Sequence, residues 1–184
     1  MRLDTCGGDI IAVPENTILH LQAHPEMEAD DYALLREAAA KANLARGGRL
    51  SAGNIVTHAV EMGHPVGKTG RVDAPAIELD TVTTFAVRKG REKPSRVTEI
   101  DPANEPDCSS VVLWVLKLAD GVWELETAYV GTDAPREPFD LGSSYSDIEW
   151  LESIGFWSRN ALVYRPKDMG QIIHTSWQEV LGWR

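Results

Sequence analysis

The feature that most constrains this chain is a pair of apolar segments joined by Asp120-Gly121. Residues 111–118 read VVLWVLKL and residues 122–130 read VWELETAYV, and both segments are rich in β-branched and aromatic residues. An Asp-Gly pair between two such segments is typical of a tight β-turn, because glycine readily adopts the positive φ that the turn requires. The sequence therefore predicts a β-hairpin here, and the fold must contain antiparallel strands.

The first third of the chain predicts helices. Asn16 is a suitable cap for a short helix that ends near His24, because the proline that follows disfavours helical geometry in the residue before it. Residues 29–45 are dominated by alanine, leucine and glutamate and are followed by two glycines, which predicts a longer helix. For residues 50–62 we favour a helix over a strand. The apolar residues that fit the helical period are Ile55, Val56, Ala59 and Val60.

The rest of the chain predicts strands with a mixed tail. Residues 81–88 (TVTTFAVR) predict a strand, and residues 96–100 are expected to pair back onto it. Residues 145–156 predict a short helix, and residues 161–164 a last strand. This order of elements predicts an α+β fold, in which N-terminal helices pack on an antiparallel sheet of about four strands and a mixed C-terminal extension follows.

Composition narrows the function classes. The chain has 184 residues, of which 43% are hydrophobic and 25% charged, so it can bury a core and is expected to form a single domain, 1–184. Its two cysteines are too few for a disulfide scaffold. No apolar segment approaches the roughly 18 residues of a membrane-spanning helix, and no signal peptide is recognisable, so we expect a cytoplasmic protein without a membrane partner. The net charge of −10 argues against broad nonspecific binding to nucleic acid.

Two short motifs resemble known ligand sites but lack a required residue. The segment 63–69 (GHPVGKT) has three residues between its glycines, whereas a phosphate-binding P-loop has four. His20 and His24 have the spacing of a metalloprotease pair, but Leu21 stands where the catalytic glutamate is needed. A metal would need a third ligand, such as His58, and we expect neither a metal nor a cofactor.

A basic segment stands out in this acidic chain. Residues 88–96 read RKGREKPSR, in which five of nine residues are basic and one is acidic. Two interpretations remain open: a solvated hairpin tip that pairs with the protein's own acids, or a phosphate-binding patch at a strand edge. Thr127 and Tyr129 alternate along the second strand of the hairpin and share one face. Their hydroxyls could donate to a phosphate, or they could simply be residues that favour strands.

Together these features resemble the superfamily of metal-independent ribonucleases that includes barnase, EndoU, the tRNase colicins and RelE, in particular its toxin and phage-associated branches. His24-Pro25-Glu26 is similar to the His-Pro-Glu stretch at the end of the first helix in phage-associated members, and Thr127-Ala128-Tyr129 is similar to a strand-ending motif of the superfamily. The resemblance covers residues 16–131, which would form the nuclease-like core, with 132–184 as the C-terminal extension. The acidity of the chain departs from such toxins, which are usually basic.

The resemblance implies cleavage of RNA without a metal. A base takes the proton from a 2′-hydroxyl, which attacks the adjacent phosphate, and an acid protonates the leaving 5′-oxygen. Histidine suits both roles because its unperturbed pKa lies near 6.5. His24 is the first candidate for this proton transfer, His20 the second and His58 the third.

The same resemblance implies a phosphate-binding group. Lys89 or Arg88 would bind the phosphate, at the end of a strand similar to the one that supplies the cationic group in the superfamily, and Thr127 and Tyr129 would orient it. Two further cations would contact the RNA backbone, namely Arg91 and Lys93.

The alternative function is a non-catalytic interaction protein. An acidic chain of this size could mimic nucleic acid and occupy the basic groove of a bacterial defence or toxin protein. The tail also carries tryptophans that could act as interface anchors or could cover the sheet. A continuous acidic face would favour mimicry, whereas a cleft that holds a histidine, a lysine and Thr127 would favour catalysis.

Overall fold

The computed structural model describes residues 1–21, 25–46, 48–50, 54–141 and 145–182, and its chain divides into two compact units. Unit 1 consists of Met1–Thr69 and Asp107–Asp133, and unit 2 consists of Gly70–Pro106 and Ala134–Arg184. Each unit has its own main sheet and its own buried apolar cluster. The expected core, residues 16–131, therefore contributes to both units, and the expected extension folds together with residues 70–106.

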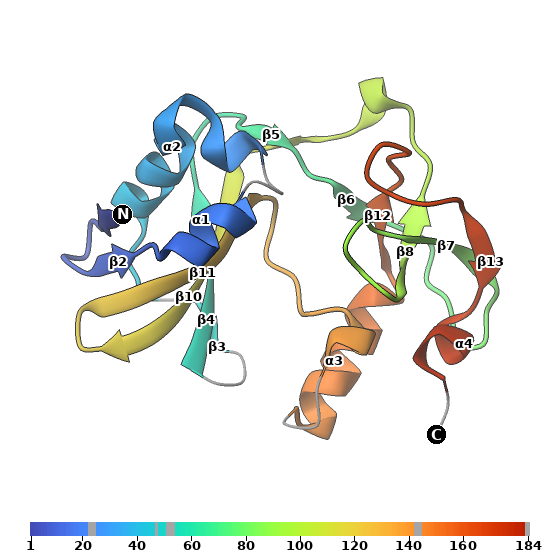
Figure 1. The fold of residues 1–184 in the computed structure, drawn as a ribbon. Helices are drawn as coiled ribbons and strands as arrows, with labels where there is room; N and C mark the ends of the chain where they lie inside the picture. Colours follow the sequence, from blue (N-terminus) through green and yellow to red (C-terminus); the bar gives the residue numbers. More distant parts are fainter. Residues whose placement is uncertain (22–24, 47, 51–53, 142–144, 183–184) are drawn as a thin grey trace. The chain divides into compact units, whose positions relative to one another are not determined.

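Unit 1 is built on a six-stranded sheet in the order β1-β2-β11-β10-β4-β3 (Figure 1). Its strands are β1 (Arg2–Asp4), β2 (Ile10–Ala12), β3 (Arg49–Leu50), β4 (Ile55–Glu61), β10 (Ser110–Ala119) and β11 (Val122–Val130). Every pairing is antiparallel except that of β2 with β11, which is parallel. A separate two-stranded sheet pairs β5 (Gly67–Lys68) with β9 (Asp107–Cys108).

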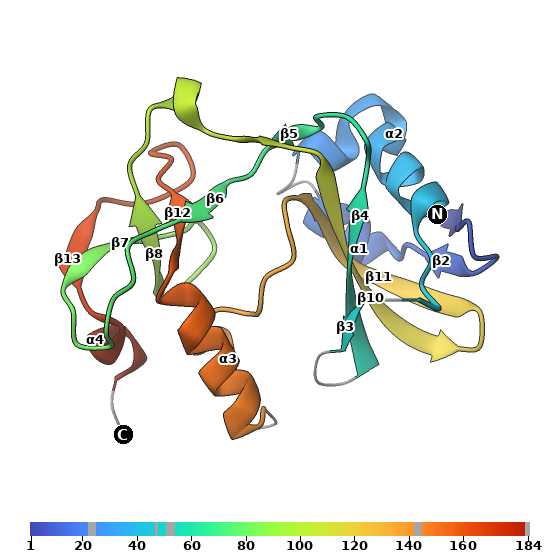
Figure 2. The same cartoon turned by 180° about the vertical axis from the view of Figure 1, so that it is seen from behind.

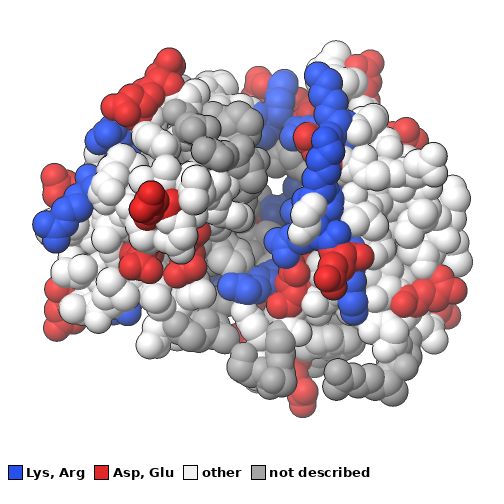
Figure 3. Space-filling model, in the orientation of Figure 1, with Lys and Arg blue, Asp and Glu red and all other residues white. Residues whose placement is uncertain are grey.

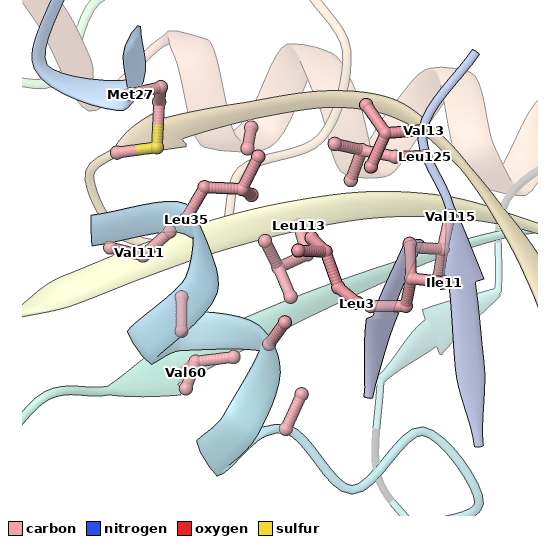
Figure 4. Packing of buried hydrophobic residues seen from close by; sticks show 14 of the residues in the cluster. Leu3, Ile11, Val13, Met27, Leu35, Val60, Val111, Leu113, Val115 and Leu125 are labelled. Atoms are coloured by element: carbon pink, nitrogen blue, oxygen red, sulfur yellow. The ribbon is translucent and has the colours of Figure 1, made fainter. Parts of the chain in front are cut away.

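Two helices cover one face of this sheet, namely α1 (Glu15–Leu21) and α2 (Pro25–Lys41). Figure 4 shows Leu35 of α2 above Val111 and Leu113 of β10, with Val60 of β4 beside them. These side chains are at most 6% exposed, and burial of apolar area is the main source of the unit's stability. Residues 30–32 of α2 have positive φ, so the helix is interrupted there.

Unit 2 holds a five-stranded sheet in the order β13-β7-β8-β12-β6, seen from behind in Figure 2. Its strands are β6 (Arg71–Asp73), β7 (Thr83–Val87), β8 (Pro94–Thr98), β12 (Asn160–Val163) and β13 (Ile173–Thr175). Its helical segments are η2 (Pro102–Asn104), η3 (Pro138–Asp140), α3 (Asp147–Trp157) and α4 (Trp177–Leu181). The buried cluster centres on Phe85, Trp157 and Trp177. No helix of the described residues is long and apolar enough to cross a membrane.

The predicted fold class is wrong. The chain is mostly sheet, with sheets of six, five and two strands instead of one sheet of about four. The error arises because residues 70–106 and 134–184 build a second sheet, so the tail is not an extension of the first. The predicted helix at residues 50–62 is also wrong. Their β-branched residues form β4, which pairs with β10 along its whole length.

The predicted hairpin is confirmed. Strands β10 and β11 pair antiparallel around Asp120-Gly121, and Gly121 has a φ of 72°. The predicted strand at 81–88 is confirmed as β7, and β8 pairs back onto it. The hairpin of β10 and β11 lies at the centre of the unit 1 sheet, so it positions Thr127 and Tyr129.

Candidate functional site

Thr127 and Tyr129 lie on the face of the unit 1 sheet that points away from α1 and α2. In the register of the hairpin, Ala128 is opposite Leu113, and both belong to the apolar cluster under the helices. Thr127 and Tyr129 flank Ala128 in the strand, so their side chains point to the other face, as the alternation predicts. The prediction that Thr127 and Tyr129 share one face of the strand is therefore confirmed.

The register adds two more residues to this face. Thr127 is paired with Trp114 of β10, Trp114 with Thr57 of β4, and Thr57 with Arg49 of β3. Directly paired residues of neighbouring strands share a face, so these four side chains form one row across four strands. We call Arg49, Thr57, Trp114 and Thr127 the polar row. Because residues 50–62 were predicted to form a helix, Thr57 was not expected on this face. No sequence motif pointed to Arg49.

The hydroxyls of the polar row are buried and have no hydrogen-bond partner. Thr57 is 2% exposed, and the Oγ1 atoms of Thr57 and Thr127 are both buried without a partner. Burying an unsatisfied hydroxyl costs about 1–3 kcal/mol, so such groups are rare and call for an explanation. At the end of the row, Arg49 donates from Nε and Nη2 to the carboxylate of Asp133, at 3.0 and 3.3 Å.

The candidate histidines lie in three different settings. His24 falls outside the described residues. His20 is exposed in the last turn of α1, and this helix is fastened to β11 because the Thr17 hydroxyl donates to the Leu125 carbonyl at 2.8 Å. His58, the third candidate, is 6% exposed and pairs with Leu113, so it lies on the helix side of the sheet, opposite Thr127. It therefore does not share a face with the polar row.

Burial keeps His58 neutral. Loss of solvent lowers the pKa of this imidazole, and the carboxylates of Asp133 and Asp9 only partly oppose the shift. Its Nε2 atom is buried and has no hydrogen-bond partner. Trp123 packs edge-on against the ring, with 6.5 Å between centroids. This environment is that of a core histidine.

The basic segment, residues 88–96, lies in unit 2, in the turn that follows β7 and in the first half of β8. Arg88 pairs with Glu137, and Arg88 Nε also donates to the Ser95 hydroxyl at 3.1 Å. Arg91 donates to Asp140 at 3.0 Å. Both acids belong to or adjoin η3, so the two arginines fasten the hairpin tip to that segment. Two other predicted cations, Lys89 and Lys93, are exposed in the same turn.

Glu137 is the buried end of this network. It is 4% exposed, and burial raises the pKa of its carboxyl, while the Arg88 guanidinium and the Ser95 hydroxyl oppose the shift. The predicted phosphate-binding cations thus belong to unit 2, whereas His20, Thr127 and Tyr129 belong to unit 1. Within unit 1, the cation that the structure brings to the face of Thr127 is Arg49.

Other places in the described residues offer little chemistry. A hollow of about 470 Å³ at the ends of β4 and β10 is lined by Leu50, Val56 and Leu118, and its charged residues, Lys117 and Asp120, pair with each other at 3.2 Å. Within the described ranges, no three His, Cys, Asp or Glu side chains are grouped as a metal ion requires.

The acidic side chains are spread over several places. On the face shown in Figure 3, the Asp and Glu side chains of the described residues form separate groups, with uncharged and basic residues between them. A protein that mimics a nucleic-acid strand needs a continuous line of negative charge. Within neither unit does the described part of this face supply one.

Comparison with known proteins gives no family. No family model matches the sequence, and no curated protein or solved structure matches it significantly.

Proposed function

We propose that this chain is an RNA-binding protein of the metal-independent endoribonuclease type, whose functional centre is the face of the unit 1 sheet that carries Thr127 and Tyr129. The observation that carries the proposal is the Thr127 hydroxyl, which is buried without a hydrogen-bond partner. A ligand that accepts a hydrogen bond from it would explain why a hydroxyl stands where valine would pack equally well. The Thr-Ala-Tyr motif at 127–129 supports the same assignment by resemblance.

In the proposed reaction, the 2′-hydroxyl of one nucleotide attacks the adjacent phosphorus, and the bond to the 5′-oxygen of the next nucleotide breaks. The products are a 2′,3′-cyclic phosphate and a free 5′-hydroxyl. A histidine accepts the proton of the 2′-hydroxyl, and the leaving oxygen is protonated by an acid. We assign proton transfer to His24, because His20 belongs to α1, which covers the opposite face of the sheet from Thr127. The hydroxyls of Thr127 and Tyr129 stabilise the charge that develops on the phosphate.

The test is cleavage of end-labelled RNA by the purified full chain in EDTA at several pH values. We expect cyclic-phosphate ends, and we expect no cut where the attacking nucleotide lacks its 2′-hydroxyl. Thr127→Val, Tyr129→Phe and His24→Ala should each lower the rate, and loss of the proton-transfer histidine should cost about 100-fold or more. His174→Ala and Tyr164→Phe, on exposed or partly buried residues of unit 2, are the matched controls. If the wild-type chain cuts no RNA at any pH, the enzyme proposal fails.

A second candidate function, binding to a protein partner, is favoured by one surface feature. Ile148 and Leu151 of α3 are 77% and 63% exposed, and their i, i+3 spacing places them side by side. Asp147 and Glu152 are exposed next to them, so the stripe would fit an apolar groove with a basic rim. A purified partner should lose affinity for Ile148→Asn but not for Val82→Asn, which alters another well-exposed apolar residue of the same unit.

A further inference from the structure

The cation that completes the functional centre is not in the basic segment. Arg49 is paired with Thr57, and Thr57 is two strands away from Thr127 on the same face. Neighbouring strands lie about 4.8 Å apart, so the guanidinium and the Thr57 hydroxyl are within reach of one small anion. Arginine suits this role because its planar fork of donors matches the oxygens of a phosphate.

Thr57 gives independent support for a ligand. Its side chain is 2% exposed, it lies on the same face as Arg49, and its hydroxyl has no hydrogen-bond partner. Its paired residue in β10 is Trp114, whose indole N–H can only donate and therefore cannot accept the hydrogen of the Thr57 hydroxyl. A donor in this position is satisfied when an oxyanion binds next to Arg49.

An acid of the chain already interacts with Arg49. The two oxygens of Asp133 accept from Arg49 Nε at 3.0 Å and from Nη2 at 3.3 Å, which is the geometry with which arginine binds the oxygens of a phosphate. The two side chains are 29% and 33% exposed, so water screens the pair. A polyanion that supplies additional contacts can therefore displace the carboxylate.

We propose that Arg49 and Thr57 form a phosphate-binding subsite for one phosphodiester of an RNA strand, and that Asp133 occupies this subsite in the free protein. The inference rests on the proposed function because the RNA strand would continue along the same face to Thr127. It differs from the sequence-based prediction, which gave the phosphate contact to Lys89 or Arg88. Asp133 is accordingly an internal competitor of RNA.

The experiment measures binding of a short, fluorescently labelled RNA to the full chain, with inorganic phosphate as a competitor. Arg49→Met and Thr57→Val should weaken RNA binding, the former by about tenfold. Asp133→Asn keeps the shape of the side chain and removes its charge, and it should strengthen binding by a similar factor. Asp107→Asn is the matched control, because Asp107 pairs with Lys68 elsewhere in unit 1 and is more exposed.

The salt dependence separates a phosphate contact from a structural effect. Loss of one phosphate contact should lower the slope of log affinity against log salt by about 0.7 for a single strand. If Arg49→Met binds RNA as wild type does, with the same slope, the inference is wrong. It is also wrong if Asp107→Asn strengthens binding as much as Asp133→Asn, or if no form of the chain binds RNA. Cooperative unfolding of each variant in urea verifies that it is folded.

Two further outcomes separate this inference from the proposed function. RNA that binds through Arg49 but is never cut would overturn the enzyme and leave the subsite in place. RNA that is cut equally well by wild type and by Arg49→Met would leave the enzyme and overturn the subsite. Free phosphate that competes only with wild-type binding, and not with the residual binding of Arg49→Met, would assign the contact to a phosphate group and not to a base.

Discussion

The hairpin tip of unit 2 and the polar row of unit 1 both hold donors that could bind an anion, but they differ in how these donors are satisfied. Arg88 pairs with Glu137, which is 4% exposed, and Arg91 pairs with Asp140. In the polar row, the hydroxyls of Thr57 and Thr127 have no partner, and Asp133, which accepts from Arg49, is 33% exposed. The tip is richer in charge and its lysines are exposed to solvent, whereas the row holds buried hydroxyls that lack a partner.

This difference shows what a count of charges misses. Opposite charges that are distant in the sequence can meet in the fold, and a buried pair of this kind is costly to separate. The number of unsatisfied buried donors is therefore a better guide to a binding site than the number of cations. Three predictions test whether unit 2 uses its buried polar groups for stability while unit 1 keeps some of them for a ligand.

The largest effect is expected from Arg96, which joins three segments of unit 2. Its side chain is 3% exposed and donates to the carbonyls of Pro75 and Ser158, each at 2.8 Å. Arg96→Met would remove both hydrogen bonds from the guanidinium, and the Ser158 carbonyl would keep only the Ile77 N–H as a donor. Hydrogen bonds from a charged group are each worth about 1.5–3 kcal/mol, so the free energy of unfolding should fall by about 3 kcal/mol. Urea unfolding followed by circular dichroism measures the change. Arg91→Met, which breaks a more exposed pair, should cost less than about 1 kcal/mol, and equal losses for both variants would contradict the comparison.

The next effect concerns pH and His58 of unit 1. Burial lowers the pKa of His58 in the folded state, so the unfolded state binds the proton more tightly. Stability is therefore complete above the unfolded pKa of about 6.5 and declines as the pH falls below it, by at most about 1.4 kcal/mol per pH unit. Urea unfolding at pH 7.5 and pH 5.5 should show this decline in the wild-type chain. His58→Leu should reduce it, and His174→Leu should not, because His174 is exposed.

Local patterns predicted the hairpins well. The Asp120-Gly121 turn and the strand at 83–87 depend on residues that are close in sequence, and both are present. The sheets as wholes were not predictable in this way. The strands β1, β2 and β3 have only two or three residues, too few for a periodic signal, and the parallel pairing of β2 with β11 joins residues about 110 positions apart. Long-range pairing of this kind leaves no trace in a local window.

For the candidate site, too, the sequence predicted the local arrangement but not the contacts between distant strands. Alternation along one strand placed Thr127 and Tyr129 on one face without any knowledge of the sheet. Arg49 and Thr57 joined them only through the register of β3, β4 and β10, which the helical interpretation of residues 50–62 excluded. The acids that pair with Arg88 and Arg91 are 49 positions away from them, so the neutralisation of the basic segment was equally hidden.

The smallest effect comes from two threonines that differ in a single hydrogen bond. In unit 2 the Thr84 hydroxyl donates to the Val97 carbonyl at 2.7 Å, whereas in unit 1 the Thr57 hydroxyl has no partner. Thr84→Val should therefore lower the free energy of unfolding by about 1 kcal/mol. Thr57→Val should raise it by about the same amount, because a methyl group replaces a buried hydroxyl that is unsatisfied in the free protein. Chemical denaturation without ligand measures both changes. A loss of stability in Thr57→Val would mean that the Thr57 hydroxyl stabilises the fold. The main evidence that the polar row binds a ligand would then be contradicted.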